Sequence, residues 1–474
     1  MPADPSLPPK SHHRGRVLTA DAATPRGREV RGHLRELLRL AWPIVIARAG
    51  ILTMALADVA MVGRHDTDEL AYASLGTALF VPLLVTGVGL MIGVLATASQ
   101  AFGSERLEAC GAIWMRALPW ATLVGAIAAL VCLQGEAILG LIGQEPVMAR
   151  EGGRVAVALA PGLFAYGLFV ASTFFLEAIN RPTPGMVAML VANVINVALN
   201  WVLIYGELGF PAMGAVGSAI TTSVVRTFLA VFIILYILRM PDRRRFGIDA
   251  ARARVALATW WPKSREARRI GLAAGAATGL ETSAHAALTQ IAGLMGVVPV
   301  GAYAIAHNVE AVMFMAALGI GSATGVLTGN AWGRGDRRGA AMAGWTGIGA
   351  TLGVMAACGL LIWLLRGPIL GVYSTDPRIV AASLPVMAVV AVAIVADGAQ
   401  MTAAHATRAL GDAWNATARA AVAFWLVMVP GGWAMGVWLG WGPAGLMAGV
   451  VIGCAVAFVL MAERFTALLR SARP

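Results

Sequence analysis

Residues 269–294 read RIGLAAGAATGLETSAHAALTQIAGL. At about 1.5 Å per residue, this run is long enough to cross a bilayer as one helix. Glu281 lies at its middle, and a carboxylate at that depth costs at least about 2.5 kcal/mol on insertion scales. His285 and Thr289 follow at steps of four and lie on nearly the same helical face. The acid must therefore face protein or water, either as a site for a cation or proton, or as a protonated group hydrogen-bonded to a neighbouring helix.

The composition extends this conclusion from one helix to the whole chain. The 474 residues are 58% hydrophobic and 13% charged, with a mean hydropathy of +0.74. Soluble domains average about 45–50% apolar and about 25% charged residues. The chain is therefore predicted to be an all-α protein that crosses the lipid bilayer many times.

The charged residues argue against a nucleic-acid-binding protein, and the cysteines argue against a disulfide framework or a cysteine metal site. The net charge of +11 comes almost entirely from arginine, because Lys10 and Lys263 are the only lysines. In a soluble protein this balance would suggest nucleic-acid binding, but in a membrane protein it marks cytoplasmic loops next to anionic lipid, so no nucleic-acid partner is expected. Four cysteines without metal-site or disulfide spacing are predicted to be small buried residues: Cys110, Cys132, Cys358 and Cys454.

Twelve stretches of the chain meet the length of about 20 apolar residues that a membrane-spanning helix needs. They are residues 38–62, 73–101, 111–134, 155–179, 184–205, 213–239, 270–294, 301–330, 342–366, 382–407, 415–438 and 443–465. Residues 1–37 are predicted to be a disordered basic cytoplasmic tail, 240–268 a basic cytoplasmic linker, and 467–474 a cytoplasmic C-terminal tail. Residues 38–239 then form an N-lobe of six helices, and residues 269–466 form a C-lobe of six.

The charges of the loops predict the orientation of the chain. Arginines are concentrated in the N-terminal tail, in the linker 240–268, in the loop 334–338 and at the C-terminal end, whereas the remaining loops are acidic or neutral. Because positively charged loops stay in the cytoplasm, both termini are predicted to be cytoplasmic. Trp260 and Trp261, beside Lys263, could hold an interfacial helix, with a solvated linker as an equal alternative.

A weak internal repeat relates the two halves of the chain. Three pairs of segments match at a separation of 230 or 231 residues: 70–73 with 301–304, 101–103 with 331–333, and 144–146 with 375–377. Each pair occupies the same place relative to the predicted spans. Six spans per half keep the halves parallel, so a pseudo-twofold axis along the membrane normal is predicted to relate the lobes. Such lobes can rock against each other around a central cavity.

The first predicted span carries two charged residues. Asp58 lies near its outer end, and Arg48 lies ten residues earlier, about 15 Å away along a helix. This separation excludes direct contact, so each charge needs a partner on another helix. Asp58 is a second candidate site for a cation. For Arg48, a structural ion pair or an extended side chain that reaches the interface is the main expectation.

Amide and imidazole groups occur in two other spans. Asn196 and Asn200 share a face of the fifth span, and Asn180 precedes this span. Such amides either line a cation or ligand site or hold helices together. In the eighth span, His307 and Glu310 are spaced to form a hydrogen bond. They are either a pair whose charge changes near neutral pH or a capping pair near the outer interface.

The tenth predicted span contributes another deep acid. Asp397 lies near its centre, and Gln400 shares its face. If Asp397 and Glu281 line one cavity, the two carboxylates could exchange protons or Na⁺ for a cationic substrate. The further residues predicted to line a substrate cavity are Asn180, Asn196, Asn200, His285, Gln400, His307 and Glu310.

Catalytic and nucleotide-binding motifs are missing from the sequence. It contains no GxxxxGK[ST], no GxSxG and no HExxH. The chain is therefore not expected to be an enzyme or an ATP-driven pump, and an ion gradient must supply the energy. No organic cofactor, structural metal or obligate protein partner is expected.

Several segments together resemble the MATE (multidrug and toxic compound extrusion) transporters, from about residue 36 to residue 465. They are LAWPI (40–44) leading to ADVAMVGR (57–64), FLEAINRP (175–182) before the asparagine-rich span, AIAHN (304–308), and TAAHATRALGD (402–412). The resemblance implies a twelve-helix antiporter of two lobes in a bacterial inner membrane, which extrudes organic cations against H⁺ or Na⁺. In NorM-type members the first, seventh and tenth spans carry the coupling and drug-binding acids, and Asp58, Glu281 and Asp397 occupy those places here. DinF-type members have an Asp where this chain has Asn200, and the NorM pattern includes neither Arg48 nor Glu310.

Two rival functions have different requirements. A flippase for lipid-linked precursors or polysaccharide would need a basic cavity to hold pyrophosphate, whereas this chain is predicted to place three acids there. An intramembrane transferase would need acids clustered at one membrane face, whereas these three acids lie at different depths. Exchange of a cationic drug for H⁺ or Na⁺ is therefore the favoured interpretation.

Overall fold

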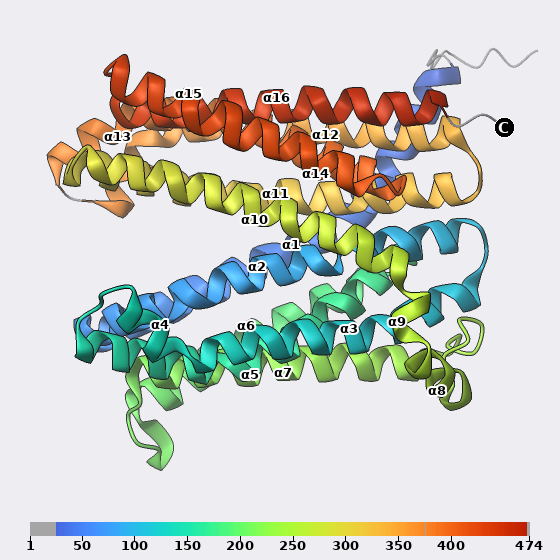
Figure 1. The fold of residues 1–474 in the computed structure, drawn as a ribbon, viewed down its shortest axis with the longest axis horizontal. Coiled ribbons are helices and arrows are strands. Elements are labelled where there is room, and N and C mark those ends of the chain that lie inside the picture. Colours follow the sequence, from blue (N-terminus) through green and yellow to red (C-terminus); the bar gives the residue numbers. More distant parts are fainter. Residues whose placement is uncertain (1–24, 375, 472–474) are drawn as a thin grey trace, which may run out of the picture.

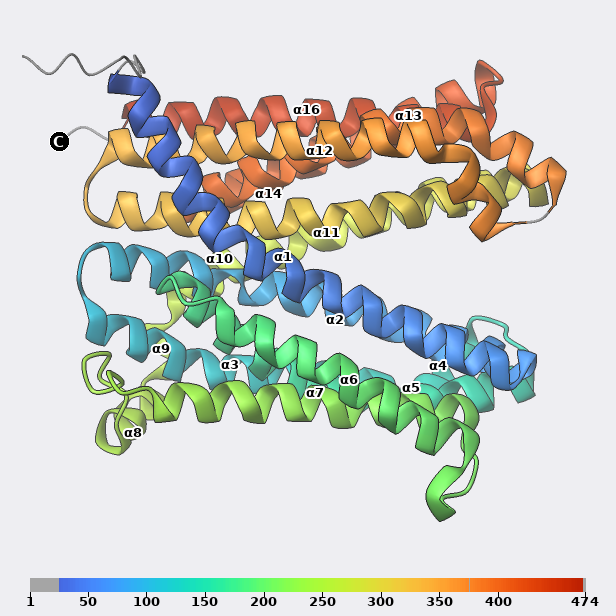
Figure 2. The same ribbon diagram turned by 180° about the vertical axis from the view of Figure 1, so that it is seen from behind.

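The computed structural model describes residues 25–374 and 376–471. Within these ranges the chain forms helices arranged in two lobes, which lie side by side with their helices roughly parallel (Figures 1 and 2). The N-lobe contains α1 (Pro25–His65), α2 (Thr67–Gly103), α3 (Leu107–Leu133), α4 (Gly135–Leu141), α5 (Pro146–Ala178), α6 (Thr183–Tyr205), a 3-10 turn (Glu207–Gly209) and α7 (Gly214–Arg239).

The second lobe repeats this plan after a connecting segment. The connection holds α8 (Ala250–Ala258) and α9 (Trp260–Lys263). The C-lobe contains α10 (Arg265–Leu294), α11 (Val297–Gly333), α12 (Arg337–Tyr373), α13 (Pro377–Ala409), α14 (Ala413–Ala421), α15 (Val429–Trp433) and α16 (Gly442–Ser471). The π-helical turns Val422–Met428 and Ala434–Trp438 join α14 and α15 into one continuous rod.

The predicted architecture of twelve spans in two lobes is confirmed. Eleven continuous helices in the described ranges are long and apolar enough to cross a membrane. The twelfth span is α10, which is long enough but less apolar, because glycine, alanine and hydroxyl residues surround Glu281 and His285. Small and polar residues of this kind are typical of helices that pack against other helices rather than against lipid.

Helix contacts follow the pseudo-twofold relation that the repeat predicts. The first helix of each lobe contacts the second helix of the other, α1 with α11 and α10 with α2. Figure 2 shows α1 crossing from the C-lobe side to the N-lobe. Within the N-lobe α5 contacts α2, α3 and α7, and within the C-lobe α13 contacts α11, α12 and α16 in the same way.

Close backbone contacts join the lobes near one end of the molecule. A Cβ atom on Gly103 of α2 would collide with the carbonyl of Asn330 of α11, and one on Gly333 would collide with the carbonyl of Gln100. The buried residues of α11 are concentrated in its second half, as are those of α2. The lobes therefore meet where α2 and α11 end, which is the end that carries the C-terminus, and they diverge toward the other end (Figure 1).

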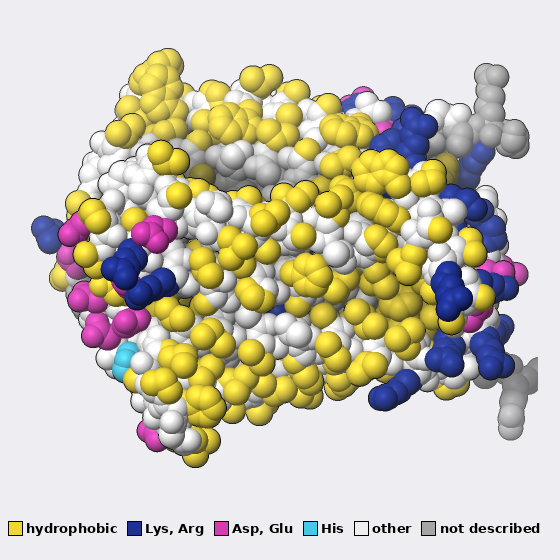
Figure 3. Space-filling view, turned by 60° about the horizontal axis from the view of Figure 1, so that its bottom comes forward, with side chains coloured by type: hydrophobic (Ala, Val, Ile, Leu, Met, Phe, Trp, Pro, Cys, Tyr) yellow, Lys and Arg dark blue, Asp and Glu magenta, His cyan; other side chains and the backbone are white. Residues whose placement is uncertain are grey.

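The two ends of the molecule differ in charge. Lysine and arginine side chains gather at the end where the lobes meet, called the basic end below, and acidic side chains gather at the opposite end together with some arginines (Figure 3). The basic end carries the loops that contain Arg243, Arg244, Arg245, Lys263, Arg334, Arg337 and Arg338. This separation matches the pattern of charged loops on which the predicted orientation rests.

One predicted segment is wrong where the structure describes it, and two others contain helix. Residues 25–37 are not a disordered tail, because α1 begins at Pro25 and Leu37 is buried in the core. The linker contains two short helices, and α10 begins at Arg265 rather than after residue 268. The C-terminal tail is helical as far as Ser471. Helices continue past the bilayer core here because residues such as Leu34 and Leu37 keep the helical spacing of apolar groups. The predictions for residues 1–24 and 472–474 lie outside the described residues.

A partly exposed ion pair at the basic end gives a pH-dependent prediction. Arg181 donates two hydrogen bonds to Asp242, at 3.0 Å and 2.7 Å, and this lowers the pKa of the Asp242 carboxyl. A lowered pKa means that the contribution to stability is present above the ordinary aspartate value of about 3.9 and is lost as the pH falls. We expect Asp242→Asn to lower stability by less than about 1 kcal/mol at pH 7. The difference from the wild type should shrink as the pH falls below about 3.9, as thermal unfolding in detergent at pH 7 and at pH 3 would show.

Candidate functional site

A polar cluster in the N-lobe surrounds Asp58 of α1. The Asp58 carboxylate accepts hydrogen bonds from the amides of Asn196 (3.0 Å) and Asn200 (2.6 Å) on α6. It also accepts one from the hydroxyl of Thr222 on α7, at 3.0 Å. Both asparagines are fully buried, whereas Asp58 is half-buried. The predicted face formed by Asn196 and Asn200 therefore fixes a carboxylate that keeps one side accessible.

The accessible side of Asp58 faces a cavity of about 320 Å³ inside the N-lobe. Residues of α1, α2, α5 and α7 line this cavity, among them Ser74, Thr77 and Thr222. Arg226 lies one turn beyond Thr222 on α7 and is buried, with its guanidinium 4.3 Å from the centre of the Phe80 ring and 5.0 Å from that of Tyr166. The N-lobe thus holds a buried cation near a carboxylate that a small ligand can approach.

The C-lobe brings its two deep acids together through one amide. The Gln400 side chain donates a hydrogen bond to Glu281 at 3.0 Å and another to Asp397 at 3.1 Å. Glu281 comes from α10 and is partly exposed, whereas Asp397 comes from α13 and is buried. The Sγ atom of Cys454 on α16 lies 3.8 Å from the Asp397 carboxylate. The predicted pairing of Glu281 and Asp397 in one site is thus what the structure contains.

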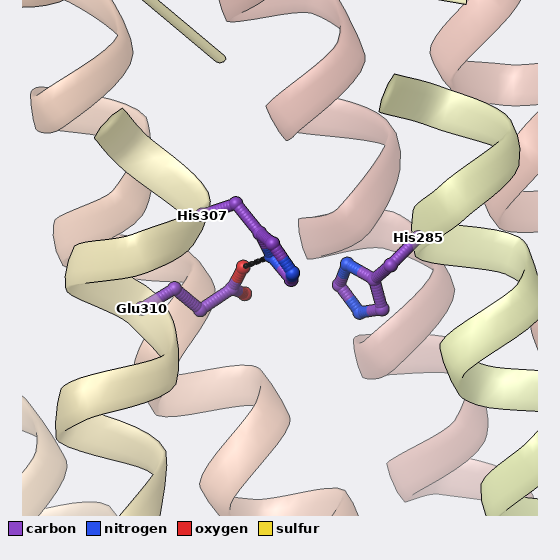
Figure 4. Close-up of side chains that lie close together, drawn as sticks. All are labelled: His285, His307 and Glu310. Atoms are coloured by element: carbon purple, nitrogen blue, oxygen red, sulfur yellow. Dashed lines mark hydrogen bonds and ion pairs between the residues drawn. The ribbon is translucent and has the colours of Figure 1, made fainter. Parts of the chain in front are cut away.

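A second group of polar side chains in the C-lobe lies at the interface between α10 and α11. His307 and Glu310 project from α11 one turn apart, and the Nδ1 atom of His307 lies 3.3 Å from a carboxylate oxygen of Glu310. His285 of α10 faces them (Figure 4). The two imidazole rings stack with their centres 4.8 Å apart. Glu310 is only 3% exposed, and its second oxygen has no hydrogen-bond partner among the described residues. This group can therefore accept a further donor or a cation.

The donor atoms of these two groups suit different cations. One ligand atom from each of His285, His307 and Glu310 lies within 4.8 Å of the others. Imidazole and carboxylate together are a donor set that Zn²⁺ accepts. The carboxylates of Glu281 and Asp397 offer oxygen alone, which is the donor that hard cations prefer. Na⁺ therefore fits the Glu281–Asp397 pair better than it fits the histidines, whereas either group has atoms that can accept a proton.

A buried ion pair lies in the N-lobe where it contacts the C-lobe. The guanidinium of Arg48 on α1 is 3.4 Å from Glu177 on α5, and both side chains are only 7% exposed. The other oxygen of Glu177 accepts a hydrogen bond of 2.7 Å from Ser322 of α11, in the C-lobe. The predicted structural ion pair for Arg48 is confirmed, and Glu177 additionally links the N-lobe to the C-lobe.

One predicted cavity residue lies elsewhere. Asn180 is an exposed residue with a φ of 61°, immediately after the end of α5. Its carbonyl oxygen accepts a hydrogen bond of 3.2 Å from Asn330 across the lobes. Asparagine tolerates this left-handed conformation after a helix because its short side chain adapts to it. Asn180 therefore ends a helix at the basic end and does not join the cluster around Asp58.

Sequence reasoning also missed three buried charges: Glu177, Arg226 and Arg408. Arg226 lies in the middle of the sixth predicted span, and the rule that charged residues inside spans need partners would have identified it. Glu177 and Arg408 lie at the ends of the fourth and tenth spans. A charge at the end of a span is ordinary in a sequence, and only the packing of the lobes buries these two.

Solved structures of transporters share this fold. The chain superposes on the eukaryotic MATE transporter AtDTX14 with a TM-score of 0.82 at 18% identity, over 94% of this chain and 99% of that one. An outward-facing conformation of a multidrug resistance MATE family transporter gives a TM-score of 0.81 at 20% identity, over 94% and 99% of the two chains. At these identities the similarity establishes the fold alone.

Sequence comparison finds relatives with higher identity than these solved structures. A "Probable multidrug resistance protein NorM" of Caulobacter vibrioides is 35% identical over 94% of this chain and 93% of that protein. The "Multidrug resistance protein PmpM" of Pseudomonas aeruginosa is 29% identical over 94% of both chains. The model of the MatE family matches twice, at residues 43–202 and 274–434, once in each lobe. The chain thus belongs to the MatE family.

Proposed function

We propose that this protein exports organic cations in exchange for H⁺ or Na⁺ by alternating access. The observation that carries the proposal is the bridge through Gln400, which holds Glu281 and Asp397 in one site between α10 and α13. Acids within membrane-spanning helices mark the paths of ions and substrates by default. The names of the relatives support a drug-like substrate, because both are called multidrug resistance proteins.

The arrangement of the lobes supports a state open to the outside. The lobes meet at the basic end and diverge at the other. If the basic end faces the cytoplasm, as the positive-inside rule requires, the protein lies in a bacterial inner membrane with both termini inside. The half-buried Asp58 and the partly exposed Glu281 would then take up ions and release drug on the outer side.

Competition for the same carboxylates is sufficient to couple the two fluxes. An ion that binds to Glu281 or Asp397 lowers the negative charge that holds a cationic drug, so the drug leaves. By the reciprocity of linked binding, the drug weakens ion binding by the same factor. Rocking of the lobes then carries the ion inward and the drug outward.

Dye efflux from proteoliposomes tests the proposal and identifies the ion. A pH gradient and a Na⁺ gradient would each be imposed alone, and ethidium release would be followed by fluorescence. We expect one of the two gradients to drive efflux. If neither gradient moves the dye in vesicles that contain correctly folded protein, cation antiport is wrong.

The Asp58 cluster gives a separate prediction. Asp58→Asn keeps a carbonyl that Asn196 and Asn200 can donate to, and its new amide N–H can donate to the Thr222 hydroxyl, so folding should be preserved. The change removes the charge that faces the N-lobe cavity, and we expect the apparent affinity for a cationic dye to fall about tenfold, the equivalent of about 1.4 kcal/mol. Dye binding followed by fluorescence polarisation would measure it. Ser74→Ala, which alters the same cavity without a charge, is the matched control and should bind the dye normally.

A further inference from the structure

A second cavity, of about 230 Å³, lies at the basic end between α2, α3 and the segment that joins the lobes. Its lining includes four cationic side chains, from Arg106, Arg116, Lys263 and Arg268, and one acid, Glu266. A carboxylate oxygen of Glu266 also lies 3.6 Å from the Nε atom of Arg269, so Arg269 partly balances the charge of this acid. The cavity is therefore strongly positive, and it is separate from the acidic sites described above.

Arg116 is the most unusual residue of this cavity. It lies nine residues into α3, about 13 Å along the helix from Leu107. Its Nε atom is buried and has no hydrogen-bond partner, and no ion pair forms at Arg116, among the residues that the structure describes. A buried N–H donor without an acceptor is unfavourable, so an anion that accepts from it would be stabilised. Glu266 lines the same cavity but forms no ion pair with Arg116 in the part of the chain that the structure describes.

Tryptophans place the cavity at the level of the membrane surface. Trp120 lines the cavity, and its ring N–H donates to the carbonyl of Leu90 at 3.4 Å. The guanidinium of Arg268 lies 3.9 Å from the centre of the Trp261 ring, and Trp261 is 55% exposed on the short helix α9. Exposed tryptophans beside basic residues are typical of the headgroup layer. Trp260 and Trp261 lie on the short helix α9, and its place at the membrane interface stays a prediction.

The walls of the cavity are apolar where they run toward the bilayer core. Leu90 and Val94 of α2 and Ile113 and Ala117 of α3 line it beside Arg116. A lipid needs this combination, because its phosphate requires cations while its glycerol and first methylenes require apolar contact. Basic pockets between membrane helices on the cytoplasmic side recognise headgroups in this way.

We propose that this cavity binds the phosphate of an anionic membrane lipid. Arg116 holds the phosphate from within, and Lys263 of α9 and Arg268 of α10 close over it. Because Arg268 lies in the first turn of α10, the bound lipid would tie the N-lobe helix α3 to the first helix of the C-lobe. The site is independent of the proposed transport function and is tested without it.

Native mass spectrometry of the detergent-solubilised protein tests the site directly. The protein would be incubated with phosphatidylglycerol or with zwitterionic phosphatidylcholine, and the retained lipid would be counted. We expect the wild type to retain phosphatidylglycerol preferentially, and Arg116→Gln and Lys263→Gln each to lower this retention about fivefold. Lys263 is exposed on α9, so its change leaves the fold intact even if Arg116→Gln does not. Arg334→Gln, an exposed basic-end residue outside the cavity, is the control and should retain lipid normally.

Three results would overturn the proposal. The first is equal retention of phosphatidylglycerol by the wild type and Lys263→Gln, and the second is equal retention of both lipids by the wild type. The third comes from adding inorganic phosphate alone. If phosphate raises the thermal stability of the wild type but not that of Lys263→Gln, while no lipid is retained, the cavity binds free phosphate and the lipid assignment is wrong.

Discussion

Ethidium export should fall to the background of cells without the transporter when Asp397 is changed to Asn, and likewise when Glu281 is changed to Gln. Each replacement keeps a carbonyl that the Gln400 amide can donate to, so the bridge between α10 and α13 survives. What is lost is a negative charge for which the ion and the cationic drug compete. Without that competition, binding of one no longer changes the affinity for the other, and coupled exchange stops.

Ethidium accumulation in cells, with membrane protein quantified on an immunoblot, would measure this effect. Glu207→Gln is the matched control, because Glu207 is an exposed acid outside both lobe sites. Glu69 is a poor control, because it lies in the first turn of α2 rather than in a loop. Its carboxylate accepts a hydrogen bond of 2.7 Å from the backbone N–H of Ala215 at the start of α7. Normal resistance in cells that express Asp397→Asn at the wild-type level would refute the coupling role.

Removal of Arg48 should give the largest loss of stability. Arg48→Ala leaves Glu177 buried without its cation, and uncompensated buried charges cost about 3–5 kcal/mol. The contact of the Arg48 guanidinium with Phe174, at 5.3 Å from the ring centre, is lost as well. Because Ser322 of the C-lobe donates to the same Glu177, disturbance of this acid also weakens a contact between the lobes. Thermal unfolding in detergent, followed by tryptophan fluorescence, would show the loss.

A double-mutant cycle separates the charge effect from lost packing. The variant that combines Arg48→Met with Glu177→Met removes both charges, so it should be more stable than Arg48→Ala alone. Ser322→Ala removes one hydrogen bond and should lower stability less than either charge change. If Arg48→Ala unfolds at the wild-type temperature, the pair does not contribute to the stability of the protein.

The fold could be predicted closely because membrane helices are encoded locally. A run of about 20 apolar residues must be helical in lipid, since the bilayer offers the backbone no other hydrogen-bond partners. The twelve predicted spans therefore lie within the observed helices or end within a residue of them. Outside the lipid, water can pair with backbone groups, so hydrophobicity does not require a helix there. For this reason the extension of α1 before residue 38 and the short helix α8 were not predicted, and a helix at α9 was only one of two alternatives.

Only part of the candidate sites could be predicted from the sequence. Asp58, Glu281 and Asp397 stand out in the sequence because an acid is rare in an apolar run. The hydrogen-bond partners of these acids do not stand out. From the sequence, the Gln400 amide could equally well be one of the polar groups that hold helices together. The sequence places Asn180 next to the asparagine-rich span, whereas the chain turns at that residue and Asn180 lies apart from the Asp58 cluster.

The sequence by itself determined the membrane class, the number of spans, the repeat and the three deep acids. Each of these follows from hydrophobicity and charge along a short stretch of chain. The tertiary structure alone decided that Glu177 is shared between the lobes, that glycines bring α2 and α11 into contact, and that Arg116 lies in a basic cavity. These features depend on residues more than a hundred positions apart meeting in space, and no local pattern of side chains specifies such a meeting.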